Sequence, residues 1–204
     1  MLIIGLTGSL GMGKSAAAEH LRSRGLPVFD ADAAVHALYE GAAVPLIEKE
    51  FPGTTSQGKV DRSKLGMAVM TNPERLAVLE AVVHPLVREA ERRFLQEEAA
   101  RGVRMAVLEI PLLFETGTDA KVDTTIVVSA PPELQRQRLM KRPGMTREKL
   151  ASLLARQMPD AEKRARADFV VDTSGEIAAS RAALDTIIAN LEHRDASAFV
   201  EFWA

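Results

Sequence analysis

Short apolar runs alternate with helix-like segments along most of this chain. Five runs are typical of short buried strands: 2–6, 27–29, 104–108, 124–128 and 169–171. Between the first two, residues 14–24 favour a helix that ends at Gly25. A strand, a helix and a second strand within about thirty residues form a βαβ unit. The pattern therefore predicts a parallel sheet that is covered by helices.

The long segment 32–101 is mainly helical in its pattern. Leu76, Leu79 and Val83 recur at spacings of three and four residues, as the apolar face of a helix does. Pro85 interrupts this periodicity, and we expect it to begin a new helix after His84. The stretch 51–58, with one proline and two glycines, favours a loop, and 176–191 favours a closing amphipathic helix.

These elements predict an α/β protein with a five-stranded parallel sheet flanked by helices. We expect one domain over 1–204, because no internal repeat or low-complexity tract divides the chain. The core is assigned to 1–32, 89–131 and 166–194. Two helical insertions interrupt it, one at about 33–88 and one at about 132–165.

Composition narrows the class of protein. The 204 residues carry a formal net charge of -2, which gives no general reason to expect nucleic acid or an anionic membrane as a partner. There is no cysteine, so disulfides and thiolate metal sites are excluded. The apolar start at 1–6 is too short for a signal sequence or a membrane span. We expect a cytoplasmic protein.

A phosphate-binding motif follows the first predicted strand. The pattern G-x-x-x-x-G-K-[ST] is matched at every fixed position by Gly8, Gly13, Lys14 and Ser15. Glycines let such a loop curl so that successive backbone N–H groups point at phosphate oxygens, and the next helix adds its positive N-terminal end. Lys14 can bridge the β- and γ-phosphates, and the Ser15 hydroxyl can ligate Mg²⁺. A plain glycine-rich turn is the alternative, but strand and helix flank the motif as it requires.

Several classes of protein carry this loop. A GTPase also needs an Asn-Lys-x-Asp motif and an Asp-x-x-Gly motif, and the chain has neither. A motor ATPase needs an acid after a strand, which Glu109 could supply, but such machines are larger and carry further arginine elements. A small-molecule kinase needs a basic lid that excludes water and compensates charge. Residues 136–166 hold ten Lys or Arg against three acids, 10 − 3 = +7 in a chain of net charge -2. A solvated helix face is the alternative for this segment.

Two carboxylates follow the second predicted strand. Asp30 and Asp32 stand at its carboxyl end, where open parallel sheets bind ligands. One can cap the next helix, and the other is then free to accept a proton from an attacking hydroxyl.

With these motifs taken together, the chain resembles the dephospho-coenzyme A kinase family. The matching segments span nearly the whole chain in family order: 6–15, 30–32 with His36, His84-Pro85, 111–115, 138–142 and 167–172. The phosphate loop is shared with many families, whereas the combination of Asp-Ala-Asp, His-Pro and Pro-Leu-Leu-Phe-Glu is specific. The resemblance implies transfer of the γ-phosphoryl group of ATP to the ribose 3′-hydroxyl of dephospho-CoA. It implies a phosphate-loop kinase fold, in which 33–88 binds the acceptor and 132–165 is the lid.

The resemblance also implies roles for single residues. Asp32, Lys14 and Arg142 are the expected catalytic residues, with Asp32 as the general base. ATP is expected to contact Thr7, Gly8, Ser9, Leu10, Gly11, Met12, Gly13, Lys14, Ser15, Ala16 and Arg142. Ser15 is the expected protein ligand of Mg²⁺. The acceptor is expected to contact Asp32, His36, His84, Pro111 and Leu112. His84 equally suits a plain helix boundary before Pro85.

Three positions depart from the family pattern. The family often has Asp where this chain has Glu109, which bears on a metal or hydroxyl contact there. A common lid arginine is Leu153 here, with Arg156 as a candidate substitute. The family has an Asp-Asn pair near adenine. The corresponding residues here are Asp172 and Thr173, so the side-chain amide is missing.

The expected mechanism is a direct in-line transfer without a covalent phosphoenzyme, under a lid that closes over both substrates. Another small kinase, acting on a nucleoside monophosphate or a sugar, is the nearest alternative. A non-catalytic ATP-binding module is the more distant one. The pattern leaves open the preference between ATP and GTP, and it allows a monomer or a small homo-oligomer. It also leaves open whether the tail 195–204 packs on the core, packs on a neighbouring subunit or is frayed.

Overall fold

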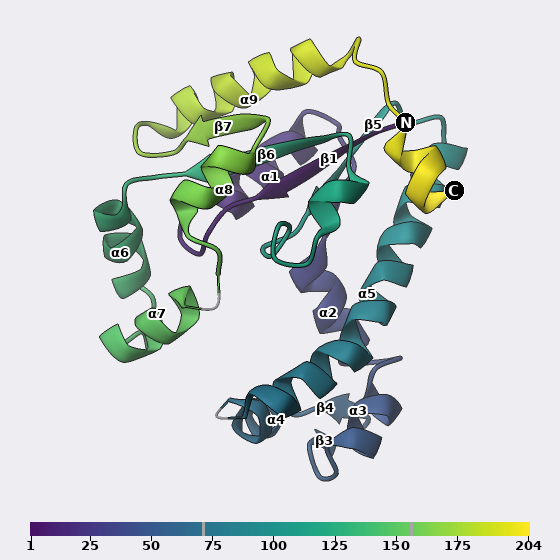
Figure 1. Ribbon diagram of the computed structural model, residues 1–204, viewed down its shortest axis with the longest axis vertical. Helices are drawn as coiled ribbons and strands as arrows, with labels where there is room; N and C mark the ends of the chain where they lie inside the picture. Colours follow the sequence, from purple (N-terminus) through teal and green to yellow (C-terminus); the bar gives the residue numbers. More distant parts are fainter. Residues whose placement is uncertain (71, 156) are drawn as a thin grey trace. The chain divides into compact units, whose positions relative to one another are not determined.

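A parallel sheet organises the chain. The computed structural model describes residues 1–70, 72–155 and 157–204, and within them five strands lie in the order β2-β5-β1-β6-β7 (Figure 1). These strands are β1 (Leu2–Thr7), β2 (Val28–Asp30), β5 (Met105–Glu109), β6 (Thr124–Ser129) and β7 (Phe169–Asp172). Central strand β1 pairs in parallel with β5 and with β6, so that Ile4 stands opposite both Val107 and Thr124. The predicted fold class is confirmed.

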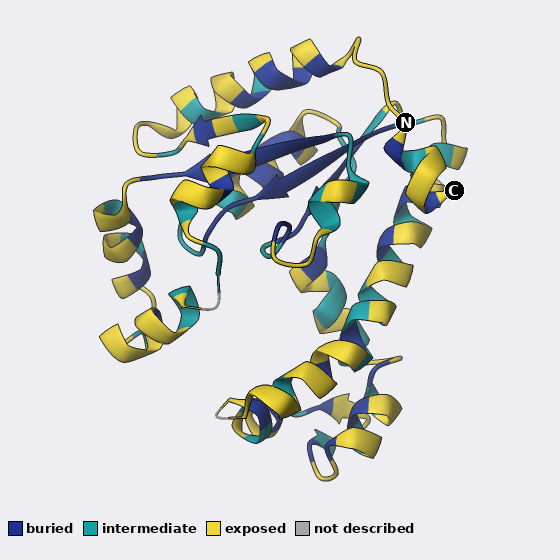
Figure 2. Ribbon diagram, in the orientation of Figure 1, coloured by how far each residue is buried: buried dark blue, intermediate teal, exposed yellow. Residues whose placement is uncertain are grey.

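Two helices cover one face of this sheet. Leu2, Ile4 and Leu6 of β1 share a buried cluster with side chains of α1 (Lys14–Ser23) and α9 (Ile177–Leu191). Figure 2 shows β1 and β6 buried along their lengths. Each fully buried aliphatic side chain contributes about 1.5–3 kcal/mol by leaving water. This apolar layer fixes the strands whose carboxyl ends lead into the candidate site.

Several of the other helices begin at a side chain that caps them. Asp30, Asp61 and Thr146 each accept a backbone N–H of the following helix, which satisfies a group that the helix itself leaves unpaired. The remaining elements are α2 (Ala31–Leu38), α3 (Val44–Glu50), α4 (Arg62–Val69), α5 (Pro73–Ala100), η1 (Thr118–Lys121), α6 (Pro132–Met140), α7 (Arg147–Leu154), α8 (Asp160–Arg166) and a short π-helix η2 (Phe199–Trp203).

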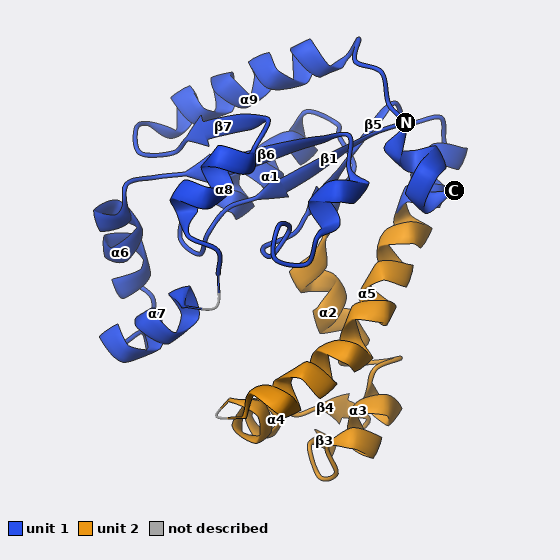
Figure 3. Cartoon of the chain, viewed as in Figure 1, with its two compact units in different colours: residues 1–29, 95–204 blue, residues 30–94 orange. Residues whose placement is uncertain are grey.

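The chain divides into two compact units, 1–29 with 95–204 and 30–94 (Figure 3). The second unit has a hydrophobic cluster of its own, built around Ile47, Phe51 and Leu65. The guanidinium of Arg75 lies 4.6 Å from the centre of the Phe51 ring, a cation–π contact within this unit. Each unit therefore has its own internal packing.

The prediction that Pro85 begins a new helix is wrong. Helix α5 continues through this position, with Pro85 inside it. A proline there leaves the carbonyl one turn earlier without its helical N–H, which costs free energy. However, Leu79 and Val83 before it and Leu86 after it belong to the same apolar cluster. Burial of this continuous face outweighs the lost hydrogen bond.

The predicted loop at 51–58 contains a strand that the sequence pattern missed. Residues of β3 (Thr55–Ser56) pair antiparallel with β4 (Lys59–Val60). Gln57 and Gly58 connect them, both with positive φ (51° and 75°), the combination that a type I′ hairpin turn requires. The strands are two residues long, too short for alternation of polar and apolar side chains to reveal them.

The C-terminal tail packs on the core. Ser197 and Ala198 donate their backbone N–H groups to Oδ1 of Asp123, whose Oδ2 accepts the N–H of Ile3. Trp203 is buried, and its indole N–H donates to the carbonyl oxygen of Lys121 at 2.8 Å. Of the arrangements that the sequence left open for the tail, packing on the core is therefore the one found.

Candidate active site

The phosphate loop connects β1 to α1, and its glycines are required by space and by backbone geometry. A Cβ at Gly8 would lie 2.5 Å from Cγ2 of Val128 and 2.7 Å from its carbonyl oxygen. Gly11 and Gly13 adopt φ of +81° and +92°, which a side chain would strain. Gly13 is also the N-cap residue of α1, so the loop ends directly at the helix N-terminus. The loop thus has the curled backbone that phosphate binding needs.

Lys14 is held by a buried acid. Its Nζ lies 2.7 Å from Oε1 of Glu109, the last residue of β5, and Glu109 is only 2% exposed. Arg22, from α1, places Nη2 3.3 Å from the other carboxylate oxygen. Two cations therefore compensate one buried carboxylate. The acid that departs from the family pattern thus has a definite partner, the lysine of the loop itself.

The loop is also tied to the segment after β5. Thr7 is fully buried, and its hydroxyl donates to the carbonyl oxygen of Pro111 at 3.1 Å. Lys163 of α8, 0% exposed, donates to the same oxygen at 3.1 Å and pairs with Glu115 at 2.9 Å. Leu112 is half-buried beside Pro111. These contacts hold the start of the phosphate loop and α8 to the same carbonyl oxygen after β5.

Thr173, the residue after strand β7, connects the loop to that strand. The Thr173 hydroxyl donates to the carbonyl oxygen of Met12 at 2.8 Å, and Arg138 donates to the carbonyl oxygen of Thr173 at 2.6 Å. The neighbouring Asp172 accepts both the backbone N–H and the hydroxyl of Ser174, which lowers the pKa of its carboxyl. Thr173, where the family pattern has an amide, is therefore engaged by the loop and by Arg138.

The lid residues singled out from the sequence fall in different surroundings. Arg142 is exposed just after α6, and Leu153 is half-buried on α7. Arg156, the candidate substitute for a lid arginine, lies outside the described residues. Ser15 and Ala16 are exposed at the start of α1.

Of the expected acceptor residues, Asp32, His36 and His84 belong to the second unit, whereas Pro111 and Leu112 belong to the first. Asp30 accepts the N–H of Ala33 at 2.9 Å and is the helix cap, so Asp32 is the carboxylate left over. Asp32 and His36 are exposed on α2, four residues apart and thus on one face of the helix. His84 is half-buried within α5, so its interpretation as a helix-boundary residue is wrong.

Sequence reasoning missed three residues that contact the loop or its wall. Lys163 was one of ten basic residues in its segment, with nothing to mark it as buried. Gln135 and Gln157 hold the backbone of Leu10 from both sides. A glutamine at a position that the helical pattern makes apolar would have been the signal for Gln135, which is 7% exposed.

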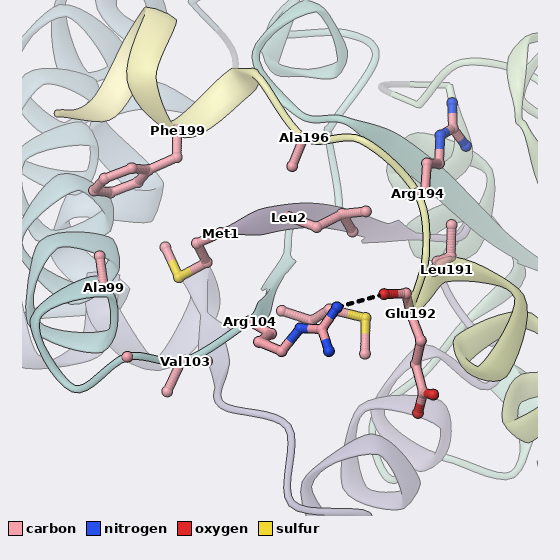
Figure 4. Close-up of a pocket in the computed structure, with 12 residues that line it drawn as sticks. Met1, Leu2, Ala99, Val103, Arg104, Leu191, Glu192, Arg194, Ala196 and Phe199 are labelled. Carbon is pink, nitrogen blue, oxygen red and sulfur yellow. Dashed lines mark hydrogen bonds between the residues drawn. The ribbon is translucent and has the colours of Figure 1, made fainter.

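A pocket of about 540 Å³ lies elsewhere in the first unit (Figure 4). It is lined at the amino ends of β1 and β5 by Met1, Leu2, Val103 and Met105, and by Phe199 of the tail. The phosphate loop follows the carboxyl end of β1, so this pocket is not the nucleotide site.

Among the described residues, no helix is long and apolar enough to cross a membrane.

Comparison with known proteins identifies the family. The family model described as dephospho-CoA kinase matches residues 2–179. A protein named dephospho-CoA kinase from Brucella melitensis is 54% identical over 198 residues, which cover 97% of this chain and 99% of that protein.

Solved structures agree with this match. The crystal structure of TT1252 from Thermus thermophilus is 41% identical with a TM-score of 0.80, covering 93% of this chain and 97% of that one. A dephospho-CoA kinase from Campylobacter jejuni is 26% identical with a TM-score of 0.61, covering 93% and 96%. The segment that the family model matches includes the phosphate loop, Asp32, Pro111 and the predicted lid 132–165. The chain therefore belongs to the dephospho-CoA kinase family.

Proposed function

We propose that this chain transfers the γ-phosphoryl group of ATP to the ribose 3′-hydroxyl of dephospho-CoA, giving CoA and ADP in the last step of CoA synthesis. One observation carries the proposal. The phosphate loop is intact, with Lys14 in place, in a chain that the dephospho-CoA kinase family model matches over residues 2–179. No observation favours an acceptor of another class, so other small kinases remain outcomes of the test.

The loop is the proposed ATP site. Backbone N–H groups between Gly8 and Ala16 surround the phosphates, apart from those of Leu10 and Met12, which donate to Gln157 and Ser9. The N-terminus of α1 adds partial positive charge. Lys14 leaves Glu109 for the β- and γ-phosphates, while Arg22 stays to compensate that carboxylate. Thr7 fixes the entry of the loop through Pro111. The protein's own contacts thereby order the loop before the substrate binds, so substrate binding does not have to supply the free energy of ordering it.

The donor set at the loop fits Mg²⁺. Among the described residues, no three His, Asp or Glu side chains lie close enough together to hold a metal ion by themselves. Mg²⁺ prefers oxygen ligands and is usually bound through few protein groups together with substrate phosphates. The exposed hydroxyl of Ser15 is such a group, and we assign it that role. When bound, Mg²⁺ would supply positive charge to the transferred phosphoryl group.

Asp32 is the proposed general base. It comes two residues after β2, and its neighbour Asp30 is already committed to capping α2. A carboxylate in this position can orient the 3′-hydroxyl and accept its proton as the new P–O bond forms and the bond to ADP breaks. His36 shares the helix face of Asp32, and we assign His36 and His84 to acceptor binding. Pro111 and Leu112 are the proposed pocket wall.

The segment 132–165 is the proposed lid. We assign its exposed Arg142 to a phosphate contact that forms when the segment closes, and closure excludes water from the transfer. The transfer is in-line and needs no phosphoenzyme. It requires one chain and two small-molecule substrates, so we propose a monomer or a small homo-oligomer that works in the cytoplasm, where ATP is abundant.

The test is an assay of purified protein with Mg²⁺-ATP and dephospho-CoA, following CoA and ADP. AMP, adenosine and gluconate serve as competing acceptors. Stoichiometric CoA and ADP, with no product from the competitors, is the expected result. ADP formed with another acceptor and not with dephospho-CoA would overturn the proposed substrate and keep the kinase. ATP binding without turnover on any acceptor would favour the non-catalytic module.

A further inference from the structure

Leu10, in the middle of the phosphate loop, is hydrogen-bonded to the lid through both of its backbone polar groups. Its N–H donates to Oε1 of Gln157 at 3.0 Å. Its carbonyl oxygen accepts from Nε2 of Gln135 at 2.7 Å. Gln135 lies on α6 and Gln157 follows α7, so the two glutamines stand at opposite ends of the basic lid segment. Both ends of the lid therefore meet at one loop residue.

Both glutamines are held in position by further contacts. Arg138, one turn after Gln135, donates to the carbonyl oxygen of Thr173 at 2.6 Å and to that of Gly11 at 3.4 Å. Met158, next to Gln157, donates its backbone N–H to Glu115 at 2.8 Å, and the same carboxylate pairs with the buried Lys163. The amides are thus fixed relative to the core on one side and to the loop on the other.

Peptide planarity turns these two bonds into control of the loop. The Leu10 carbonyl and the Gly11 N–H belong to one trans peptide unit and point in opposite directions. The Gln135 bond therefore sets where the Gly11 N–H points. The Gln157 bond sets the preceding peptide unit in the same way. A Cβ at Gly11 would lie 2.8 Å from Cγ of Leu139, so α6 also packs directly against this turn of the loop.

We propose that Gln135 and Gln157 are positioning residues that couple nucleotide binding at the phosphate loop to closure of the lid. The inference rests on the proposed function, since it takes the loop as the ATP site and 132–165 as the lid. A phosphate group that orders the two peptide units of Leu10 also orders Gln135 and Gln157, the two side chains that attach the lid to the loop. We call these two side chains the lid anchors. Because such coupling is reciprocal, a lid whose anchors are lost weakens ATP binding, and bound ATP no longer orders that lid.

The first experiment measures affinity for a non-hydrolysable ATP analogue with Mg²⁺ by calorimetry. Gln135→Leu and Gln157→Leu should each weaken binding roughly tenfold, as expected when a backbone group loses its hydrogen-bond partner. The double variant should lose less than the sum, because both bonds hold the same residue. Gln137→Leu, which changes an exposed glutamine on the same helix, is the matched control and should bind as the unaltered protein does.

A second comparison separates hydrogen bonding from bulk and charge. Gln157 accepts and Gln135 donates, since a backbone N–H can only donate and a carbonyl can only accept. Gln157→Glu keeps the acceptor and should bind more tightly than Gln157→Leu. Gln135→Glu loses the donor and should bind no better than Gln135→Leu. Both glutamates add the same charge, so this asymmetry reports the hydrogen bonds.

The coupling itself is read by trypsin cleavage within 136–166 at saturating nucleotide. The analogue should protect the lid in the unaltered protein and in Gln137→Leu, and should fail to protect it in Gln135→Leu and Gln157→Leu. Equal protection in all four proteins would overturn the inference. Absence of binding or of protection in the unaltered protein would instead count against the assigned loop or lid. If Gln135→Leu fails to fold, as judged by circular dichroism, the less buried Gln157 variants still decide the question.

Discussion

The Nζ of Lys14 and Oε1 of Glu109 lie 2.7 Å apart, with the carboxylate 2% exposed and shared with Arg22. The lysine of the phosphate loop thus forms an ion pair with a buried acid on the neighbouring strand. In this arrangement each partner compensates part of the desolvation of the other. In the proposed mechanism, the pair fixes where Lys14 begins its movement toward phosphate.

Removing the charge of Glu109 should destabilise the fold. Glu109→Gln leaves Lys14 and Arg22 without their shared anion, and we expect a loss of about 3 kcal/mol in the free energy of unfolding, measured with urea. Glu109→Asp, which restores the residue common in the family, should lose much less. Glu133→Gln is the control, because the Glu133 pair with Arg136 is exposed and surface pairs contribute about 0–1 kcal/mol. Equal losses at 109 and 133 would show that the buried pair is unimportant.

The two carboxylates after β2 should give opposite results on substitution. Asp32→Asn should lower turnover by about a hundred- to ten-thousand-fold with little change in stability, as loss of a general base does. Asp30→Ala should cost about 1 kcal/mol in stability, because α2 loses its cap, and should leave most of the turnover. Lys14→Ala should remove most turnover and serves as the inactive reference. Near-normal activity of Asp32→Asn would exclude its role as the base.

Glu48 should make the stability of the second unit depend on pH. The N–H of Gly53 and the hydroxyl and N–H of Thr55 bind its carboxylate and lower its pKa from the ordinary value of 4.5. A lowered folded pKa means that the contribution is present above about pH 4.5 and is lost as the pH falls through the folded pKa. The difference in urea midpoint between the unaltered protein and Glu48→Gln should therefore be larger at pH 7 than at pH 3. A difference that does not change with pH would contradict this.

Asp123 should be sensitive to replacement by its amide. Both of its oxygens accept backbone N–H groups, from Ile3 on one side and from Ser197 and Ala198 on the other. Asp123→Asn must point its NH₂ group at one of these donors, and we expect a loss of about 2 kcal/mol in unfolding free energy. Asp195→Asn, an exposed change in the same tail, should leave stability within about 0.5 kcal/mol. Matching melting curves for the two variants would show that the tail adds nothing through Asp123.

Local pattern was sufficient to predict the sheet, the phosphate loop and a cap from one of the two aspartates after β2, while the structure shows that Asp30 is the cap. The strands follow from apolar runs, and Gly8 to Ser15 follows from spacing within eight residues, so neither needs knowledge of distant contacts. Pro85 was misjudged because its tolerance depends on the packing of the apolar residues before and after it along α5. The contacts of Leu10 with Gln135 and Gln157 join residues more than a hundred positions apart, which spacing along the chain does not reveal.

The place of β1 in the sheet also has a consequence for synthesis on the ribosome. This strand is made well before its two neighbours, β5 and β6, which are the segments 105–109 and 124–129. Until those segments emerge, both edges of an apolar central strand are unpaired, and such edges promote aggregation. Chaperone dependence of the nascent chain should thus be greatest before residue 129 has left the ribosome and should fall once β6 can pair.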